Sequence, residues 1–62
     1  MKINKEKLEL LMANACITKK DLAKKADLSE ITIARMKTGR NVKPITIGKI
    51  AKALNVKAED LI

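Results

Sequence analysis

Apolar residues recur along the chain at helical spacing, and no alternating strand pattern runs for more than a few residues. In five places an apolar residue precedes a capping position and a second apolar residue follows five positions after the first. This is the spacing of the hydrophobic staple, in which the residue before a helix cap packs on the fourth helical residue. The pattern therefore predicts an all-α, compact five-helix domain. The five pairs are Ile3/Leu8, Ile17/Leu22, Leu28/Ile33, Val42/Ile47 and Val56/Leu61.

The capping residues of these five segments differ in quality. Asn4, Thr18 and Ser29 can each accept a hydrogen bond from a free backbone N–H, and such a cap is worth roughly 1 kcal/mol. Lys43 and Lys57 instead place a cation at the positive end of the helix dipole, which is unfavourable unless a bound anion compensates. The fourth and fifth helices should therefore begin less firmly. The expected helices cover about 5–14, 19–25, the segment between Ser29 and Gly39, 44–55 and 58–62.

Three other residues mark helix boundaries. Asp21 lies three residues after Thr18, where it completes a pair that resembles a capping box. Pro44 falls at the first position of the fourth helix, where its missing N–H costs nothing. Gly39 follows the third helix, where a left-handed residue is favoured. Gly48, inside the fourth helix, costs about 1 kcal/mol relative to alanine, and the sequence gives no reason for it.

The third helix has apolar residues on two faces. Ile33 and Met36 form an inward stripe with Leu28, whereas Ile31 points elsewhere, alongside Arg35. An isoleucine and an arginine on the outer face of a short helix call for a functional explanation. The other residues expected on inward faces are Leu8, Leu11, Met12, Ala15, Leu22, Ala23, Ala26, Ile47, Ile50, Ala51, Leu54 and Leu61.

Length and composition limit what this chain can be. With 62 residues, 47% hydrophobic and 34% charged, it is too short for two cores and too apolar for disorder, so residues 1–62 are expected to form a single domain. Cys16 is the only cysteine and there is no histidine, so we expect no intrachain disulfide, no metal site and no cofactor. Charges near the amino terminus interrupt any run long enough for a signal peptide or membrane span, which predicts a cytoplasmic protein.

The cationic residues are concentrated in the second half of the chain. The formal net charge is +7, and residues 35–57 contain no acidic residue. A surface of this kind suits a polyanion, either nucleic acid or an anionic membrane. A membrane-bound helix would need a wide apolar face of its own, whereas the apolar faces here are used by the core. The basic residues of this stretch are Arg35, Lys37, Arg40, Lys43, Lys49, Lys52 and Lys57.

Enzymatic activity is poorly supported. The chain has no histidine, no aromatic residue and no glycine-rich phosphate loop, and its carboxylates are scattered singly. The lack of aromatic residues also disfavours binding of single-stranded nucleic acid by base stacking. We therefore expect a protein that is not an enzyme and that has no small-molecule ligand.

The second and third helices are joined by a very short turn, "ADL", and Ala23 lets them approach closely. This is the layout of helix-turn-helix DNA-binding proteins. The elements "DLAKKADLS", Ile33, Gly39, Pro44, "IAKALNV" and "EDLI" together resemble the phage-repressor/Cro-type (XRE-like) helix-turn-helix family, without gaps from about Leu8 to Ile62. The resemblance implies a five-helix DNA-binding domain, usually dimeric on its operator, in transcriptional control of bacteria, phages or mobile elements.

The resemblance also assigns the base contacts to the third helix. Its candidates are Glu30, Ile31, Thr32 and Arg35. Arg35 would bind guanine O6 and N7, Glu30 would accept from cytosine N4, and Ile31 and the Thr32 methyl would pack on thymine methyl groups. Three alternatives remain open: a phosphate contact for Arg35, a dipole-stabilising role for Glu30, and a contact with a partner subunit for Ile31.

Phosphate contacts are expected at the start of the second helix and in the loop after the third. A glutamine that commonly follows the cap of the second helix in the family is replaced here by Lys19, with Lys20 beside it. A lysine can hold a phosphate as a point charge, assisted by the helix amino terminus. The matching candidates in the loop are Thr38, Arg40, Asn41 and Lys43.

Two positions depart from the family pattern. The turn position that often holds glycine is Asp27, which tolerates a left-handed backbone less well than glycine. Many members also pair an arginine in the first helix with a glutamate after the third, whereas the corresponding residues here are Met12 and Lys37. An apolar contact in place of that ion pair is often neutral for stability.

These observations predict a sequence-specific double-stranded DNA-binding regulator, a repressor, that places its third helix in the major groove and binds its operator as a homodimer. The alternative is a protein-interaction module, an antitoxin-like protein or a partner of another regulator, for which DNA binding is secondary. That alternative would use Ile31 and Ile45, which are both expected to be exposed.

Overall fold

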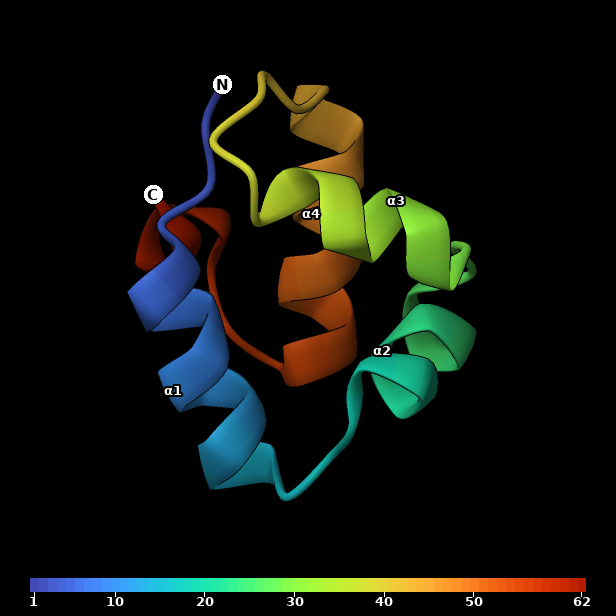
Figure 1. Ribbon diagram of the computed structural model, residues 1–62. Coiled ribbons are helices and arrows are strands. Elements are labelled where there is room, and N and C mark those ends of the chain that lie inside the picture. The colour runs from blue at the N-terminus through green and yellow to red at the C-terminus, as the bar shows by residue number, and fades with distance from the viewer.

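The computed structural model describes residues 1–62 and contains four α-helices, one 3₁₀ helix and no strand (Figure 1). The all-α class is therefore confirmed. The expected fifth helix is a single 3₁₀ turn rather than an α-helix, because it has only four residues and closes with a short-range bond from the Asp60 N–H to the Lys57 carbonyl. The elements are α1 (Lys5–Ala15), α2 (Lys19–Ala26), α3 (Glu30–Met36), α4 (Pro44–Leu54) and η1 (Ala58–Leu61).

Helix α4 lies at the centre of the fold. It contacts α1, α2 and η1, while α3 packs on α2 and crosses in front of α4 in the view of Figure 1. Four apolar residues of α4 are buried, as the helical period predicts. None of these helices has the length and the hydropathy that a membrane span requires.

The five predicted staples account for most of the core. Six large side chains are fully buried, and five of these are the second members of the staple pairs. Of the first members, Ile3 and Val42 are buried, whereas Ile17, Leu28 and Val56 are half-buried and pack against the core. The sixth fully buried residue is Ile50 of α4. Spacing in the sequence thus identified the residues around which the helices assemble.

The caps are confirmed by their hydrogen bonds. Asn4 Oδ1 accepts from the Lys7 N–H at 3.1 Å, and Ser29 Oγ accepts from the Thr32 N–H at 3.1 Å. Thr18 and Asp21 form a complete capping box, in which each side chain accepts from the other residue's backbone N–H at 3.2 Å. These bonds satisfy donors that the first turn of a helix otherwise leaves free.

The hydrogen bonds of the capping box hold the pKa of the Asp21 carboxyl below its usual value of 3.8. The bonds from Thr18 are the main cause. Desolvation by burial acts in the opposite direction, and the nearby charges of Lys24 and Lys25 lower the pKa further. The carboxylate form is therefore favoured by folding.

Helix α4 begins without such a cap. Lys43 makes no side-chain hydrogen bond to the first turn, and no acidic residue lies in that turn. Pro44 occupies the first helical position, as predicted, and Val42 is buried with Ile47. The start of α4 is therefore defined by its proline and its staple, while its positive end stays free of a protein anion.

Three connections between helices share one backbone arrangement. Helices α1, α2 and α4 each end at a non-glycine residue in the left-handed conformation: Cys16, Asp27 and Asn55, with φ of 55°, 58° and 58°. The following residue's N–H then bonds to a carbonyl five positions back, as in the Schellman motif. The residues that follow are Ile17, Leu28 and Val56. The backbone N–H of each closes one helix, and its side chain begins the staple of the next.

Two helix features differ from expectation or lack an explanation. Ala15, expected on the inward face of α1, is exposed. A periodic pattern can be continued to any length, but Ala15 is the last residue of α1 and the chain leaves the helix at Cys16. A Cβ atom added at Gly48 would meet nothing within 4 Å, so nothing in the structure explains this glycine.

The amino-terminal segment ties distant parts of the chain together. The Met1 amino group donates to the Val42 carbonyl at 3.1 Å, and the Val42 N–H donates back to the Met1 carbonyl. The Asn4 N–H donates to the Leu61 carbonyl at 2.6 Å, and Lys7 Nζ donates to the Ile62 carbonyl at 2.9 Å. The two ends therefore lie close together, as Figure 1 shows.

Candidate nucleic-acid interface

The turn between α2 and α3 sets the geometry of the candidate interface. Asp27 adopts the left-handed conformation that the family usually gives to glycine, and the Leu28 N–H donates to the Ala23 carbonyl at 2.8 Å. Ser29, the residue after Leu28, is the N-cap of α3. Because Ala23 is buried and small, α3 packs closely on α2. The aspartate therefore does not prevent the short turn that the sequence predicted.

Helix α3 divides into an inner and an outer face. Ile33 and Met36 are buried in the core, whereas Glu30, Ile31 and Arg35 are exposed. Ile31 keeps 65% of its surface accessible. The outward isoleucine and arginine expected from the sequence are thus both present on the outer face.

Thr32 differs from the other three base-contact candidates. It was expected to face outward, but it is only half-exposed, because it lies four residues before the buried Met36 and so borders the inner face. Its Oγ1 lies 2.8 Å from Ser29 Oγ, which already accepts from the Thr32 N–H. The hydroxyl of Thr32 is therefore engaged within the helix cap.

A groove separates α3 from the start of α4, and we call it the α3–α4 groove. It brings two of the base-contact candidates, Thr32 and Arg35, together with three of the phosphate candidates, Arg40, Asn41 and Lys43. Residues of α3 and of the loop that lie five or more positions apart in the chain thus line one continuous surface. The remaining lining residues are Leu28, Met36, Val42 and Thr46.

A second, shallower hollow lies on the other side of Arg35. It is lined by Ile31, Ala34, Arg35, Thr38 and Arg40. Arg35 and Arg40 therefore border both hollows and form a cationic ridge between them. The Thr38 hydroxyl donates to the Arg35 carbonyl at 2.6 Å, so this predicted phosphate contact also fixes the chain where it leaves α3. Gly39 follows with φ of 80°, a conformation that other residues adopt only with strain.

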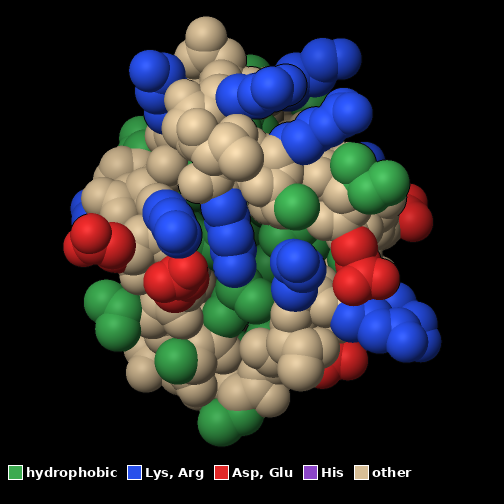
Figure 2. Space-filling view, viewed as in Figure 1, with side chains coloured by type: hydrophobic (Ala, Val, Ile, Leu, Met, Phe, Trp, Pro, Cys, Tyr) green, Lys and Arg blue, Asp and Glu red, His purple; other side chains and the backbone are tan.

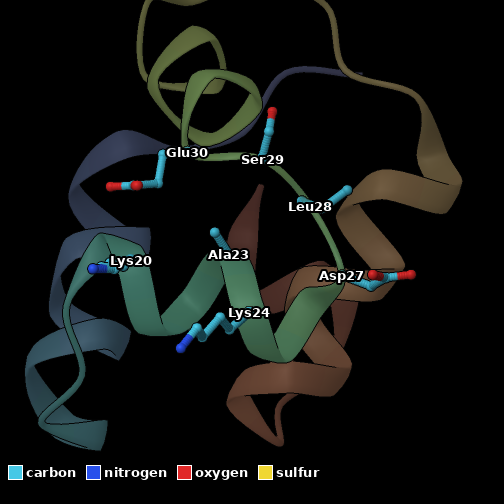
Figure 3. Close-up of a pocket in the computed structure, with 7 residues that line it drawn as sticks. All are labelled: Lys20, Ala23, Lys24, Asp27, Leu28, Ser29 and Glu30. Carbon is cyan, nitrogen blue, oxygen red and sulfur yellow. The ribbon is translucent and has the colours of Figure 1, made fainter.

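A third hollow lies between α2 and the start of α3, and Figure 3 shows the residues that line it. Lys20 and Glu30 extend to the same side of the turn, whereas Asp27 points to the opposite side. Lys24, one turn after Lys20, lines the same hollow. The structure thus places Lys20 next to the outer face of α3, while Lys19 is exposed and lines none of these hollows.

Charge is unevenly distributed over the surface. In Figure 2, Lys and Arg side chains lie at the upper end of the molecule, over the α3–α4 loop and the start of α4, and others lie across its middle. Acidic side chains lie in the middle band of the same view, and none is visible at the upper end. The structure contains no cluster of residues that could hold a metal ion and no buried polar side-chain atom without a hydrogen-bond partner. The chemistry available at this end is therefore that of exposed cations, hydroxyls and amides.

Two residues near the interface were not predicted. Thr46 lines the α3–α4 groove and Lys24 lines the hollow beside α2. Their positions could have indicated this, because Thr46 is a polar residue three positions after Lys43 and Lys24 lies four positions after Lys20. Residues three or four apart on a helix share a face.

Comparison with known proteins agrees with this geometry. A family model described as the Cro/C1-type HTH DNA-binding domain matches residues 7–62. The fold is similar to the crystal structure of the restriction-modification controller protein C.AhdI from Aeromonas hydrophila, with a TM-score of 0.84 and 25% sequence identity, over 94% of this chain and 89% of that chain. No curated protein matches the chain. The match to the family model covers the whole stretch from Leu8 to Ile62 that resembles the family, so the resemblance is confirmed.

Proposed function

The chain belongs to the Cro/C1-type helix-turn-helix DNA-binding family, a family of transcription regulators, and from this premise we propose that it is a sequence-specific repressor that inserts α3 into the major groove of its operator. One observation carries the proposal: the outer face of α3 is bordered on one flank by the cationic α3–α4 groove and on the other by the hollow beside α2, where Lys20 and Lys24 lie with Asp27 and Glu30. A reading helix flanked by phosphate-binding groups is what a duplex requires, because the backbone strands run on either side of the groove.

Each outer residue of α3 has a distinct role in this proposal. Arg35 donates to guanine O6 and N7, and Glu30 accepts from cytosine N4. Ile31 packs on a thymine methyl group, which suits a large apolar side chain that is 65% exposed. Thr32 contributes its methyl group rather than its hydroxyl, since the hydroxyl is bonded to Ser29.

The flanking groups hold the duplex in register. Lys20 reaches one backbone strand from the start of α2, with Lys19 beside it, and Arg40 and Lys43 reach the other strand from the α3–α4 loop. A phosphate at the free positive end of α4 would also take the place of the missing cap. Asn41, Thr38 and the unpredicted Thr46 lie around the same loop and supply polar groups.

The proposed repressor binds as a homodimer, and its operator contains two half-sites. Two copies reading the same face of the duplex require half-sites roughly 10–10.5 base pairs apart or a multiple of this distance. The similarity to a restriction-modification controller protein supports a regulatory role for a chain of this size and fold.

Selection of binding sites from random duplex DNA at a stated salt concentration tests the proposal. We expect an enriched motif with two related half-sites. The variant Arg35→Ala should relax base preference at one position per half-site and cost about 1–3 kcal/mol, whereas Lys19→Ala should weaken binding to all duplexes alike. Equal loss on specific and random DNA for Arg35→Ala would remove this residue from the readout.

The protein-interaction alternative rests on two exposed isoleucines, Ile31 at 65% and Ile45 at 69% accessibility. Ile45 lies in the first turn of α4, outside the lining of the α3–α4 groove. If no DNA motif is enriched, this alternative becomes the better one, and Ile45→Ser should then weaken binding to the partner protein more than any loop lysine does.

A further inference from the structure

Some lysines of the acid-free stretch are not used by the proposed function. Lys49 and Lys52 lie on the later part of α4, and together with Lys25 of α2 they line a shallow hollow. All three are exposed. We call them the α2–α4 lysine cluster. Its other lining residues are Ala26, Asp27 and Ala53, so one carboxylate faces three ammonium groups.

The lysines of the cluster lie outside the proposed reading surface, and its hollow shares only Asp27 with the hollow beside α2. None of its three lysines lines the α3–α4 groove or the hollow beside α2. Lys43 stands at the start of α4, and Lys52 lies about 13 Å further along the helix axis, at a rise of 1.5 Å per residue. In Figure 1 the start of α4 adjoins the α3–α4 loop, while its later turns adjoin α2. The proposed contacts of the first duplex, at α3, the α3–α4 loop and the start of α2, therefore do not use the lysines of the cluster.

The chemistry of the cluster indicates which polyanion it fits. Protein-binding sites are centred on aromatic or arginine anchors held in apolar pockets, and this hollow offers only two alanines. Bidentate recognition of carboxylates favours arginine, and the cluster has none. Lysines act instead as point charges toward phosphates, without reading sequence. Lys49 and Lys52 are also three residues apart on one helix, where like charges repel and a polyanion relieves the repulsion.

We infer that the α2–α4 lysine cluster binds the phosphate backbone of a second segment of double-stranded DNA, so that one domain bridges two duplex segments. The inference rests on the proposed function, since the first segment is the one held by α3. The second contact is independent of sequence and strongly dependent on salt. It would hold two operators, or an operator and distant DNA, close to one another.

The test is a bridging assay with matched charge variants. A surface-attached duplex of random sequence is loaded with protein and offered a second, fluorescent duplex of about 12 base pairs, roughly one helical turn. The test variant is Lys49→Gln/Lys52→Gln, and the control is Lys2→Gln/Lys5→Gln, which removes the same charge from exposed positions elsewhere. Glutamine keeps the helix propensity of lysine, and thermal melts of both variants verify folding.

We expect wild-type protein and the control to capture the second duplex, and the test variant to capture about tenfold less at low salt, with the salt slope of capture lowered by about 2. Affinity for a single short duplex should differ less than twofold between the two variants. Equal loss of capture in both variants, or no capture by wild-type protein that does bind the first duplex, would overturn the inference alone. Failure of wild-type protein to bind any duplex would overturn the proposed function.

A further arm replaces the fluorescent duplex with fluorescent polyglutamate. Retention of polyglutamate equal to that of DNA, lost again in Lys49→Gln/Lys52→Gln, would show that the cluster takes acidic protein segments and would overturn the assignment to DNA. Adding Lys25→Gln to the test variant should reduce DNA capture further, because this lysine faces the same hollow. Unchanged capture would remove Lys25 from the cluster.

Discussion

Helices α2 and α4 begin in opposite ways. Helix α2 has a complete capping box and an acidic residue in its first turn, and most of its residues are polar. Helix α4 begins at Lys43 with no side-chain cap and no acid in its first turn, yet four of its residues belong to the core. One helix is stabilised mainly at its end, and the other mainly along its length.

This difference matters for function as well as stability. A capped start has its free N–H groups satisfied by the protein, whereas an uncapped start keeps its positive end available to an anion. The uncapped start of α4 lies in the α3–α4 groove, beside Arg40 and Asn41. The missing cap of α4 therefore lies at a place where a bound phosphate can compensate for it.

The largest loss of stability is expected from a substitution at a buried position of α4. Ile47 is fully buried in α4, and Ile47→Ala should lower the free energy of unfolding by about 2–5 kcal/mol, most or all of the stability of a domain this small. Urea denaturation followed by circular dichroism measures the loss. Ile45→Ala, in the same helix but 69% exposed, is the matched control and should change stability by less than about 0.5 kcal/mol. Similar losses in both variants would contradict the account of α4.

A smaller effect is expected from the capped helix. Thr18→Ala removes the cap of α2 and should lower the free energy of unfolding by about 1 kcal/mol. Lys43→Ala, at the equivalent position of α4, removes no cap bond and should have a much smaller effect. Urea midpoints of the two variants give the comparison directly. If Lys43→Ala were as destabilising as Thr18→Ala, the starts of the two helices would not differ as the hydrogen bonds indicate.

Supplying the missing cap should separate stability from binding. Lys43→Ser places a good cap before Pro44 and should raise the free energy of unfolding by about 0.5–1 kcal/mol. It also removes one cation from the α3–α4 groove, which should lower the salt slope of DNA binding by about 0.9. Lys43→Gln removes the charge without adding a good cap and serves as the control. A gain in stability for both variants would show that charge, not capping, is the cause.

The smallest effect is expected on the pH dependence of stability, through the carboxyl group of Asp21. The folded-state pKa of Asp21 is lowered by its bonds from Thr18, so its contribution to stability is fully present above the usual value of 3.8 and is lost as pH falls through the lowered pKa. The stability difference between wild-type protein and Asp21→Asn should therefore shrink as pH falls below that value. Urea midpoints measured from neutral to strongly acidic pH give this difference. A gap that stays constant with pH would show that the carboxylate does not act through its charge.

The sequence predicted the structural features that depend on residues close to one another along the chain. The staple pairs identified five of the six fully buried large residues, and the caps at Asn4, Thr18 and Ser29 form as expected. It did not predict that Ile17, Leu28 and Val56 each close one helix with a backbone N–H and also begin the staple of the next helix. That signal was available, since an apolar residue follows Cys16, Asp27 and Asn55 in turn, but the left-handed conformation of three non-glycine residues is not evident from composition.

The site was less predictable because it depends on tertiary placement. That Ile31 and Arg35 face outward follows from the helical period. The meeting of Arg35 with Arg40, Asn41 and Lys43 along the α3–α4 groove depends on where the loop returns to the core. The half-burial of Thr32 follows instead from its position four residues before the buried Met36. The hydrogen-bond pattern of η1 likewise could not be derived from staple spacing, which is satisfied by an α-helical or a 3₁₀ turn.

The hydrogen bonds at the chain ends have a consequence for the order of folding. Met1 and Val42 are joined across 41 positions and Lys7 and Ile62 across 55, whereas the helix caps span three. Closing long loops costs more entropy than closing short ones, so we expect these distant pairs to form last and to open first. Hydrogen exchange should therefore show the amides of Asn4 and Val42 opening while α2 and α3 remain protected. Such an opening would release the α3–α4 loop and let it adjust to the shape of a bound duplex.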